Sequence, residues 1–171
     1  GKEVLAFILV PAGHAGANKE LLHNLELPYQ AVTSTDLYLT HYLNDSANDP
    51  VMNRIRAQKL RNSEEDKVKI FFVPSYLNGD DGVLNMPYYD LLVGMDLTAF
   101  PSYYEPWGYT PLESLAFKVP TITTTLAGFG LWVKEHYNMN HPGIEVIHRE
   151  DGDASNVATA IAEWVKNYTQ V

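Results

Sequence analysis

Residues 4–10 read Val-Leu-Ala-Phe-Ile-Leu-Val, an apolar run without a polar interruption. Such a run is typical of a strand that is buried on both faces of a parallel sheet. Residues 11–13, Pro-Ala-Gly, end the run, because proline and glycine interrupt regular structure. Residues 68–73 form a second strand-like run, which stops at Pro74. Together the two runs predict a sheet with parallel strands.

The rest of the chain alternates between helical and strand patterns. The strongest helical pattern covers residues 48–61, where Asn48 or Asp49 can cap the helix and Pro50 suits its first turn. Other helices are predicted at residues 18–27, 88–93, 110–117, 131–137 and 156–168, strands at 97–100, 121–124 and 144–147, and loops at 78–82 and 127–130. This order predicts an α/β fold, in which helices cover both faces of a Rossmann-like parallel sheet and ligands bind at the carboxyl ends of the strands. Because no repeat or linker interrupts the pattern, we expect a single domain over residues 1–171.

The composition limits the classes of function. The 171 residues are 46% apolar and 19% charged, which is enough for a packed core. The chain has no cysteine, which excludes disulfides and thiolate metal sites, and its net charge of −9 argues against binding to nucleic acids or anionic membranes. The longest apolar run is far shorter than the about 20 residues of a membrane span, and no basic segment precedes it as in a signal peptide. We therefore expect a soluble cytoplasmic protein, and the abrupt start at the first strand indicates a piece of a longer polypeptide.

Residues 70–117 differ from the rest of the chain in composition. They contain no Lys, Arg or His, but they hold six acidic residues, six of the eleven tyrosines, Trp107 and five prolines. Stiff loops with aromatic rings and carboxylates suit neutral, hydroxyl-rich or planar ligands, because carboxylates accept hydrogen bonds from hydroxyl groups and rings stack. The alternative is a surface cluster of aromatic side chains without a ligand.

The densest part of this segment reads Pro-Ser-Tyr-Tyr-Glu-Pro-Trp-Gly-Tyr-Thr-Pro-Leu-Glu, residues 101–113. Its second half predicts a capping box, with Thr110 as the N-cap of a helix, Pro111 in the first turn and Glu113 three residues after the cap. The start of that helix would direct unpaired N–H groups and the positive end of the helix dipole outward, which suits a phosphate. Glu105 precedes a proline in an irregular loop and caps nothing obvious, so it is the stronger candidate for a functional acid.

Residues 101–113 closely resemble the signature of the eukaryote-type glycogen synthases, glycosyltransferase family three. Further segments fit the same family and together cover most of the chain: residues 4–8 with 11–12, 40–41, 47–49, 53–56, 68–72, 119–120, 128–130 and 144–149. The resemblance implies a two-lobe enzyme of the GT-B type, with Rossmann-like lobes and an active site in the cleft between them. This chain resembles most of the C-terminal, nucleotide-binding lobe.

The resemblance also implies a role for each matching residue. Glu105 and Glu113 match the glutamate pair of retaining transferases: Glu105 would contact the donor glucose and stabilise positive charge at its anomeric carbon, and Glu113 would accept hydrogen bonds from the ribose hydroxyls. Tyr88 and Tyr109 match positions that pack against uracil, and Thr110 would present its backbone N–H to the pyrophosphate. The implied reaction moves glucose from UDP-glucose to the non-reducing end of an α-1,4-glucan with retention, without an obligatory metal or other cofactor.

Other candidate residues carry weaker signals. Gly128 and Gly130 alone are more typical of a plain strand-to-helix turn, but beside the signature they are candidates for binding the donor. The six histidines lack the spacing of a metal site, so we expect no structural metal. Asp80 and Asp81 are expected in a solvated loop, and Trp164 in the core.

The chain also departs from the family pattern. A donor diphosphate needs cationic partners, yet residues 70–117 supply none. In the family, an Arg and a Lys from a segment before the first strand have this role; that segment, the acceptor-side lobe with its histidine and the arginine cluster that senses glucose 6-phosphate have no counterpart here. The long helical insertion is reduced to residues 15–32, and these differences favour a bacterial member. The expected partners are UDP-glucose, a glucan and the N-terminal lobe of the same polypeptide, without which the chain should be inactive.

Two functions remain open. The first is the donor half of a glucan synthase, and the second is a non-catalytic Rossmann-like module that binds a sugar nucleotide or a carbohydrate. The complete glutamate pair favours the enzyme, because a degenerate module has no need to keep Glu105. A flavodoxin-like signalling domain ranks last, since the chain lacks the acidic cluster and the lysine that such domains use.

Overall fold

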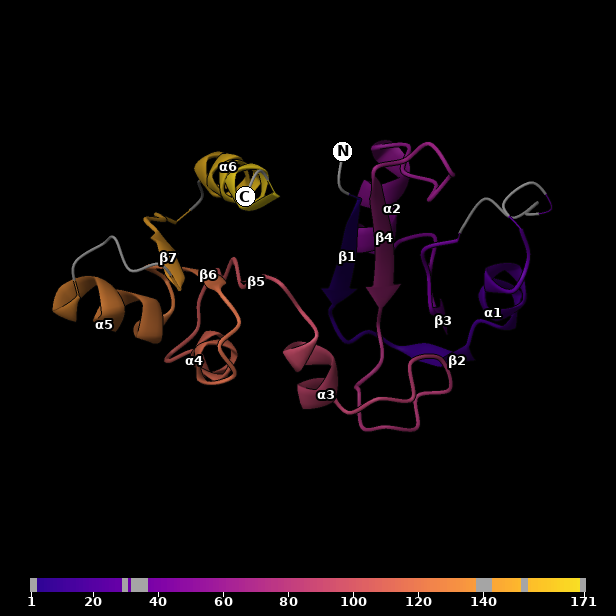
Figure 1. Ribbon diagram of the computed structural model, residues 1–171, viewed down its shortest axis with the longest axis horizontal. Helices are drawn as coiled ribbons and strands as arrows, with labels where there is room; N and C mark the ends of the chain where they lie inside the picture. Colours follow the sequence, from indigo (N-terminus) through magenta and orange to yellow (C-terminus); the bar gives the residue numbers. More distant parts are fainter. Residues whose placement is uncertain (1–2, 29–30, 32–36, 138–142, 152–153, 170–171) are drawn as a thin grey trace. The chain divides into compact units, whose positions relative to one another are not determined.

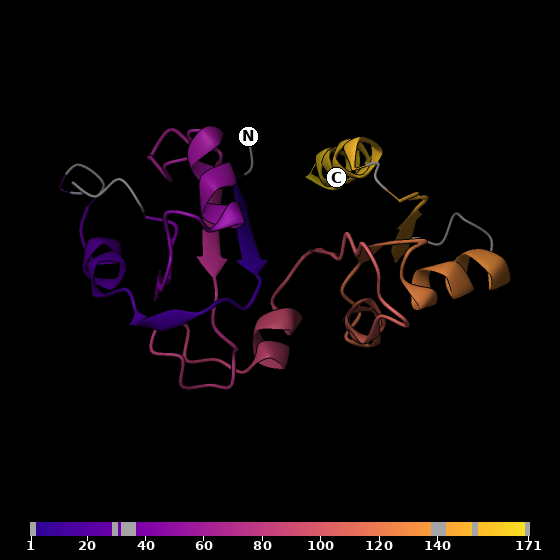
Figure 2. The same cartoon turned by 180° about the vertical axis from the view of Figure 1, so that it is seen from behind.

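A computed structural model describes residues 3–28, 31, 37–137, 143–151 and 154–169. The protein is a mixed α/β structure with parallel sheets, as predicted (Figures 1 and 2). The chain divides into two compact units, residues 1–88 and 89–171. Within the described ranges, the first unit holds two two-stranded sheets and the second a three-stranded sheet. The expectation of one domain over residues 1–171 stays a prediction.

The first unit is built on two parallel strands. β1 (Val4–Leu9) pairs with β4 (Val68–Val73) along its whole length, so both apolar runs form the predicted strands. The prediction that β1 is buried on both faces is wrong at Leu5, which is 56% exposed opposite Lys69. A continuous apolar run predicts a strand, but it does not report which of its positions are covered.

The first unit also contains two short strands that the sequence pattern did not predict. β2 (His14–Ala17) and β3 (His41–Leu43) pair in antiparallel orientation, and they have only four and three residues. Segments of this length carry no periodic signal. α1 (Lys19–Leu25) follows β2, and the Asn18 side chain caps it by accepting hydrogen bonds from two backbone N–H groups of its first turn.

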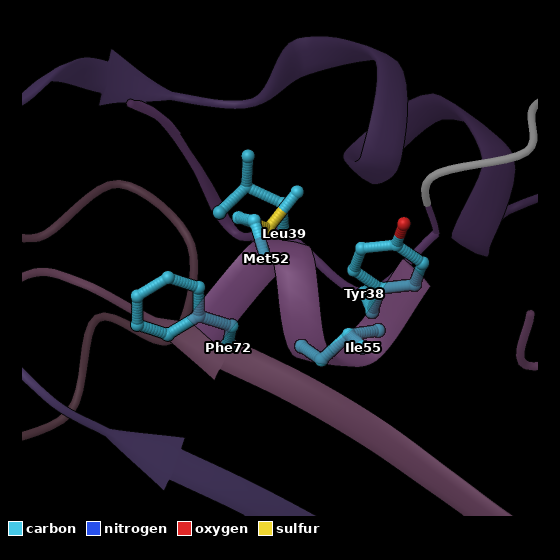
Figure 3. Close-up of a cluster of buried hydrophobic side chains, with 5 residues drawn as sticks. All are labelled: Tyr38, Leu39, Met52, Ile55 and Phe72. Carbon is cyan, nitrogen blue, oxygen red and sulfur yellow. The ribbon is translucent and has the colours of Figure 1, made fainter. Parts of the chain in front are cut away.

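The core of the first unit lies between α2 (Pro50–Ala57) and β4. Asp49 caps the helix, since its carboxylate accepts a hydrogen bond from the Met52 N–H at 2.8 Å. The helix ends before the predicted limit at Arg61. Figure 3 shows the cluster of buried side chains that joins helix and strand: Tyr38, Leu39, Met52, Ile55 and Phe72.

The second unit contains a three-stranded parallel sheet. Its strands β5 (Thr98–Ala99), β6 (Thr121–Thr124) and β7 (Ile144–Ile147) lie in the order β5-β6-β7. α4 (Tyr109–Ala116) connects β5 to β6, α5 (Gly128–His136) connects β6 to β7, and α6 (Ser155–Thr169) follows β7. α3 (Tyr88–Val93) begins at the last residue of the first unit.

Helices cover both faces of this sheet, as expected for a Rossmann-like arrangement. Ile144 and Val146 pack with α5 through Phe129 and Val133, whereas Ile147 packs with α6. Residues 144 and 146 point to the face opposite that of residue 147, because side chains alternate along a strand. Trp164 packs against the buried cluster of Ile122, Ile147 and Val157, which confirms its predicted place in the core. No helix within the described ranges is long and apolar enough to cross a membrane.

Candidate functional site

Three segments of the second unit follow the carboxyl ends of its parallel strands. Residues 100–108 follow β5, residues 125–127 follow β6, and Arg149 lies shortly after the end of β7. The segments are in contact: Glu105 forms a parallel bridge with Ala127, and Arg149 is hydrogen-bonded to the first of them. This edge of the sheet is the candidate site, since ligands of open α/β sheets bind beyond the carboxyl ends of the strands.

Glu105 is held at this edge by its backbone. Its N–H donates to the Leu126 carbonyl at 3.1 Å, and its carbonyl accepts from the Gly128 N–H at 3.1 Å. The side chain is half-buried, and its Oε2 accepts a hydrogen bond from the Ser102 hydroxyl at 3.0 Å. A carboxylate has about four acceptor positions, so this contact leaves capacity for a ligand.

Arg149 is a site residue that the sequence analysis missed. Its side chain is buried, and Nη1 donates to the carbonyl oxygens of Pro101 at 2.7 Å and Ser102 at 3.2 Å. The guanidinium carbon lies 4.1 Å from the centroid of the Tyr103 ring, a cation–π contact. Residues 70–117 contain no cationic side chain, but Arg149 reaches the signature loop (residues 101–108) from a distant part of the sequence. In the sequence, Arg149 is marked only by its position shortly after an apolar strand. That position does not reveal contacts to residues almost fifty positions away.

The helix after this loop begins one residue earlier than predicted. Gly108 is the N-cap of α4, in a left-handed conformation with φ 94° that favours glycine. The predicted capping box is therefore wrong. Thr110 lies inside the first turn, and Oε1 of Glu113 accepts a hydrogen bond from the Tyr89 hydroxyl at 2.9 Å.

The Tyr89 ring stacks on Phe117, with ring centroids 5.3 Å apart. The hydrogen bond to Glu113 and the negative charge of that carboxylate raise the pKa of the Tyr89 hydroxyl above its usual 10.0. Tyr89 therefore stays protonated as a donor, and it orients one oxygen of Glu113 at the surface of α4.

The aromatic residues of the signature divide into two groups. Tyr109, the first residue of α4, is 67% exposed, and Tyr104 is 82% exposed. Trp107 instead packs inward, with its ring centroid 5.8 Å from that of Phe129. The tyrosines are thus available to a planar ligand, whereas the tryptophan holds the loop on the core. Thr110 follows Tyr109 in the first turn, where backbone N–H groups lack partners within the helix.

Gly128 and Gly130 lie in the first turn of α5, not in the predicted loop. A Cβ atom on Gly128 would come within 2.1 Å of the Pro106 carbonyl oxygen, and one on Gly130 within 2.2 Å of the Thr124 carbonyl oxygen. Both glycines therefore allow the helix to approach the signature loop and β6. A contact between these glycines and the donor stays a prediction.

Two N–H groups at the start of α5 already have partners. The Gly128 N–H donates to the Glu105 carbonyl, and the Phe129 N–H donates to the Trp107 carbonyl at 2.6 Å. A phosphate at these groups would have to displace the loop that carries Glu105. The start of α4 is therefore the better candidate for a phosphate seat.

Tyr88 differs from the other predicted site residues. It is half-buried at the start of α3, where its N–H donates to the Leu77 carbonyl at 3.0 Å. Tyr88 is the last residue of the first unit, whereas Glu105, Glu113 and the remaining predicted residues belong to the second. The structure brings the second group together, and a shared site with Tyr88 stays a prediction.

The loop that follows β4 holds a buried carboxylate. The prediction of a solvated loop is wrong for Asp81, whose carboxylate is fully buried. It accepts hydrogen bonds from the N–H groups of Val83, Leu84 and Asn85 at 3.0, 2.9 and 2.7 Å. Burial alone would raise the pKa of Asp81, but these three hydrogen bonds and nearby His41 outweigh it, and the pKa lies below the usual 3.8.

His14, His41 and His136 pack against other rings. His41 is fully buried, with Nε2 donating to the Asp81 carbonyl at 2.8 Å, and its ring meets that of His14 edge-on. The His136 ring stacks on Trp132. In the part of the chain that the structure describes, no three His, Asp or Glu side chains are arranged to hold a metal ion.

Comparison with known proteins gives one consistent result. Residues 18–171 match the glycogen synthase family. The chain is 36% identical over 133 residues to glycogen (starch) synthase isoform 1 of Saccharomyces cerevisiae, in a match that covers 76% of this chain and 19% of the yeast protein. It is 38% identical over 133 residues to glycogen (starch) synthase of Neurospora crassa, covering 77% of this chain and 19% of the relative.

The same likeness extends to animals. The chain is 43% identical over 97 residues to the liver glycogen (starch) synthase of Mus musculus, covering 57% of this chain and 14% of the mouse protein. The matched region is thus a fifth or less of the length of each of these relatives.

Proposed function

This chain belongs to the glycogen synthase family, and we propose that it forms the donor-binding part of a retaining glucosyltransferase. The proposed reaction moves glucose from UDP-glucose to the non-reducing end of an α-1,4-glucan. The observation that carries the proposal is the half-buried carboxylate of Glu105, which keeps acceptor capacity beyond its hydrogen bond to Ser102. Beside the anomeric carbon, such a group would stabilise the positive charge that develops during transfer.

The nucleotide would bind at the start of α4. Tyr109 is largely exposed there, and its ring would stack on uracil, with Tyr88 as the second ring. The Thr110 N–H lies in the first turn, where unpaired N–H groups and the helix dipole favour the pyrophosphate. Glu113 would accept hydrogen bonds from the ribose hydroxyls, in exchange with or in addition to the Tyr89 hydroxyl. Gly128 and Gly130 would serve the donor by allowing α5 to support the loop.

The charge of the donor supports the need for a second lobe. A diphosphate requires cationic partners, and Arg149 already donates to the carbonyls of Pro101 and Ser102. The cations and the glucan-binding surface would therefore come from the N-terminal lobe, and this polypeptide alone would transfer no glucose. We propose that the transfer needs no metal ion, so that full-length enzyme treated with a chelator would keep its activity.

The decisive experiment is ligand-observed NMR of this chain with UDP and ADP together at millimolar concentration. We expect saturation transfer to the uracil protons, its loss in Tyr109→Ala and its retention in Tyr104→Ala, a matched control at an exposed tyrosine in the loop that precedes α4. A preference for adenine would overturn the UDP assignment. Equal saturation transfer to the uracil protons in Tyr109→Ala and Tyr104→Ala would overturn the assigned role of Tyr109.

The second candidate is a non-catalytic module that binds a sugar nucleotide or a carbohydrate. It is favoured by the same exposed tyrosines, which suit stacking without chemistry. The effect of a substitution at Glu105 distinguishes the two candidate functions. A binding module would keep its nucleotide affinity and have no turnover to lose in Glu105→Gln, whereas the full-length transferase would lose turnover.

A further inference from the structure

Glu105 is not held by its own backbone alone: a chain of contacts leads from Arg149 through Ser102 to its carboxylate. From this chain we infer that Ser102 and Arg149 are positioning residues for Glu105 in glucosyl transfer, an inference that rests on the proposed function. Neither residue is assigned a role by the signature itself. Both act through Glu105 and not through contact with the donor.

Ser102 restricts the carboxylate directly. Its hydroxyl donates to Oε2 of Glu105 at 3.0 Å. The last torsion of a glutamate side chain is otherwise broad, so a carboxylate without such a partner samples many orientations. A fixed carboxylate presents its charge to the reacting carbon without reorganisation, which is the main source of electrostatic catalysis.

Ser102 is itself fixed from two sides. Its carbonyl oxygen accepts hydrogen bonds from Oγ1 of Thr124 at 2.9 Å and from Nη1 of Arg149 at 3.2 Å. The same Arg149 nitrogen holds the Pro101 carbonyl at 2.7 Å, and the guanidinium lies over the Tyr103 ring. Thr124 of β6 and Arg149, which follows β7, thus both hold the start of the signature loop.

Arg149 is costly as a purely structural residue. It is only 6% exposed, and its buried Nε has no hydrogen-bond partner among the described residues. A buried cation with an unpartnered donor destabilises a fold relative to an apolar side chain of similar size. The conformation of the signature loop gives a reason for the presence of Arg149, since a planar guanidinium can donate hydrogen bonds to two carbonyl oxygens and cover an aromatic ring at once.

The main test is Ser102→Ala in the full-length enzyme that contains this chain. We expect kcat to fall about 10- to 100-fold, as for the loss of a hydrogen bond to a charged group, while the KM for the donor stays within about twofold. The melting temperature should not change, because the backbone contacts of residue 102 remain. A purely structural role would instead lower the melting temperature and leave kcat intact.

Matched variants complete the test. Ser114→Ala removes a buried hydroxyl that has no hydrogen-bond partner among the described residues, so kcat should stay at the parental value. Ser102→Thr retains the hydroxyl and should restore most of the lost kcat. Arg149→Lys keeps the charge but loses the planar group, and it should lower kcat with the KM nearly unchanged. If the Arg149 variant does not fold, the Ser102 series still decides the inference.

The outcomes separate this inference from the proposed function. If Ser102→Ala is as active as the parent while Glu105→Gln is impaired, the positioning role is overturned and the proposed function stands. If Glu105→Gln is also as active as the parent, the proposed function fails and the inference with it. A fall of kcat in Ser102→Ala that Ser102→Thr does not restore would also overturn the role of the hydroxyl.

Discussion

Asp81 and Glu105 both lie in loops that follow parallel strands, but their carboxylates are held in opposite ways. Asp81 is fully buried and accepts hydrogen bonds from three backbone N–H groups of its own loop. Glu105 is half-buried and accepts from one side-chain hydroxyl. The difference teaches that an acid saturated by its own backbone serves the fold, whereas an acid held by a single side chain keeps capacity for a ligand.

The strongest test of this contrast is Glu105→Gln in the full-length enzyme. Removing the charge should lower turnover by about 100- to 1,000-fold, the loss typical of a preorganised electrostatic group, while the free energy of unfolding stays the same. Steady-state kinetics and thermal denaturation measure the two quantities. Glu150→Gln is the control, because this side chain is 81% exposed. A Glu105 variant with parental turnover would remove the functional half of the contrast.

The reverse result is expected for Asp81→Ala. Three backbone donors would lose their acceptor, so the free energy of unfolding should fall by about 2–3 kcal/mol. Urea denaturation of the chain measures the change. Asp80→Ala, at the exposed neighbouring position, should stay within about 0.5 kcal/mol of the parent. Equal effects of the two variants would contradict the structural role of Asp81.

A smaller effect is expected for Thr124→Val. Its Oγ1 donates to the Ser102 carbonyl, so the variant should be destabilised by about 1 kcal/mol. Thr123→Val makes the same change at the adjacent position, where the buried hydroxyl has no described partner, and it should be neutral or stabilising. Urea denaturation again compares the pair. If Thr123→Val proves to be the more harmful variant, the support of the signature loop by β6 is refuted.

The smallest effect concerns pH. The pKa of Asp81 in the folded protein lies below its usual 3.8, so its contribution to stability is complete above that value and is lost as the pH falls through the lowered pKa. The free energy of unfolding should therefore decline below about pH 4, and less steeply in Asp81→Asn. Denaturation at several acidic pH values tests this. If the free energy of unfolding depends on pH in the same way in parent and variant, Asp81 does not contribute to the loss of stability in acid.

The sequence predicted the elements that carry a long-range pattern. β4 and β7 have the predicted bounds, because both segments are rich in the β-branched and aromatic residues that favour strands. The predictions at element ends failed for stereochemical reasons. The cap of α4 is Gly108, chosen by its left-handed backbone, where the pattern favoured Thr110. The start of α5 is Gly128, because close approach to another segment requires a glycine there and the sequence shows only a loop-like residue.

The candidate site was predicted in part. Glu105 stood out because nothing local explained it, and the structure leaves its carboxylate with one side-chain partner. Arg149 did not stand out, because its partners lie in a loop that is distant in sequence. Asp81 was wrongly predicted to be solvated because its partners are backbone N–H groups. Almost every residue has such a group, so the sequence does not indicate which of them will bond a carboxylate. Local patterns report elements, whereas such contacts depend on the assembled sheet.

The steric limits at Gly128 and Gly130 have a consequence for mutational tolerance. A Cβ at either position would lie within 2.2 Å of a backbone carbonyl oxygen, and a backbone atom cannot move aside as the end of a side chain can. A randomised library of these two codons should therefore return glycine under selection for folding alone. Strict retention of both glycines would then measure the packing of α5 on the signature loop, and it would be the same in a variant that had lost all affinity for a sugar nucleotide.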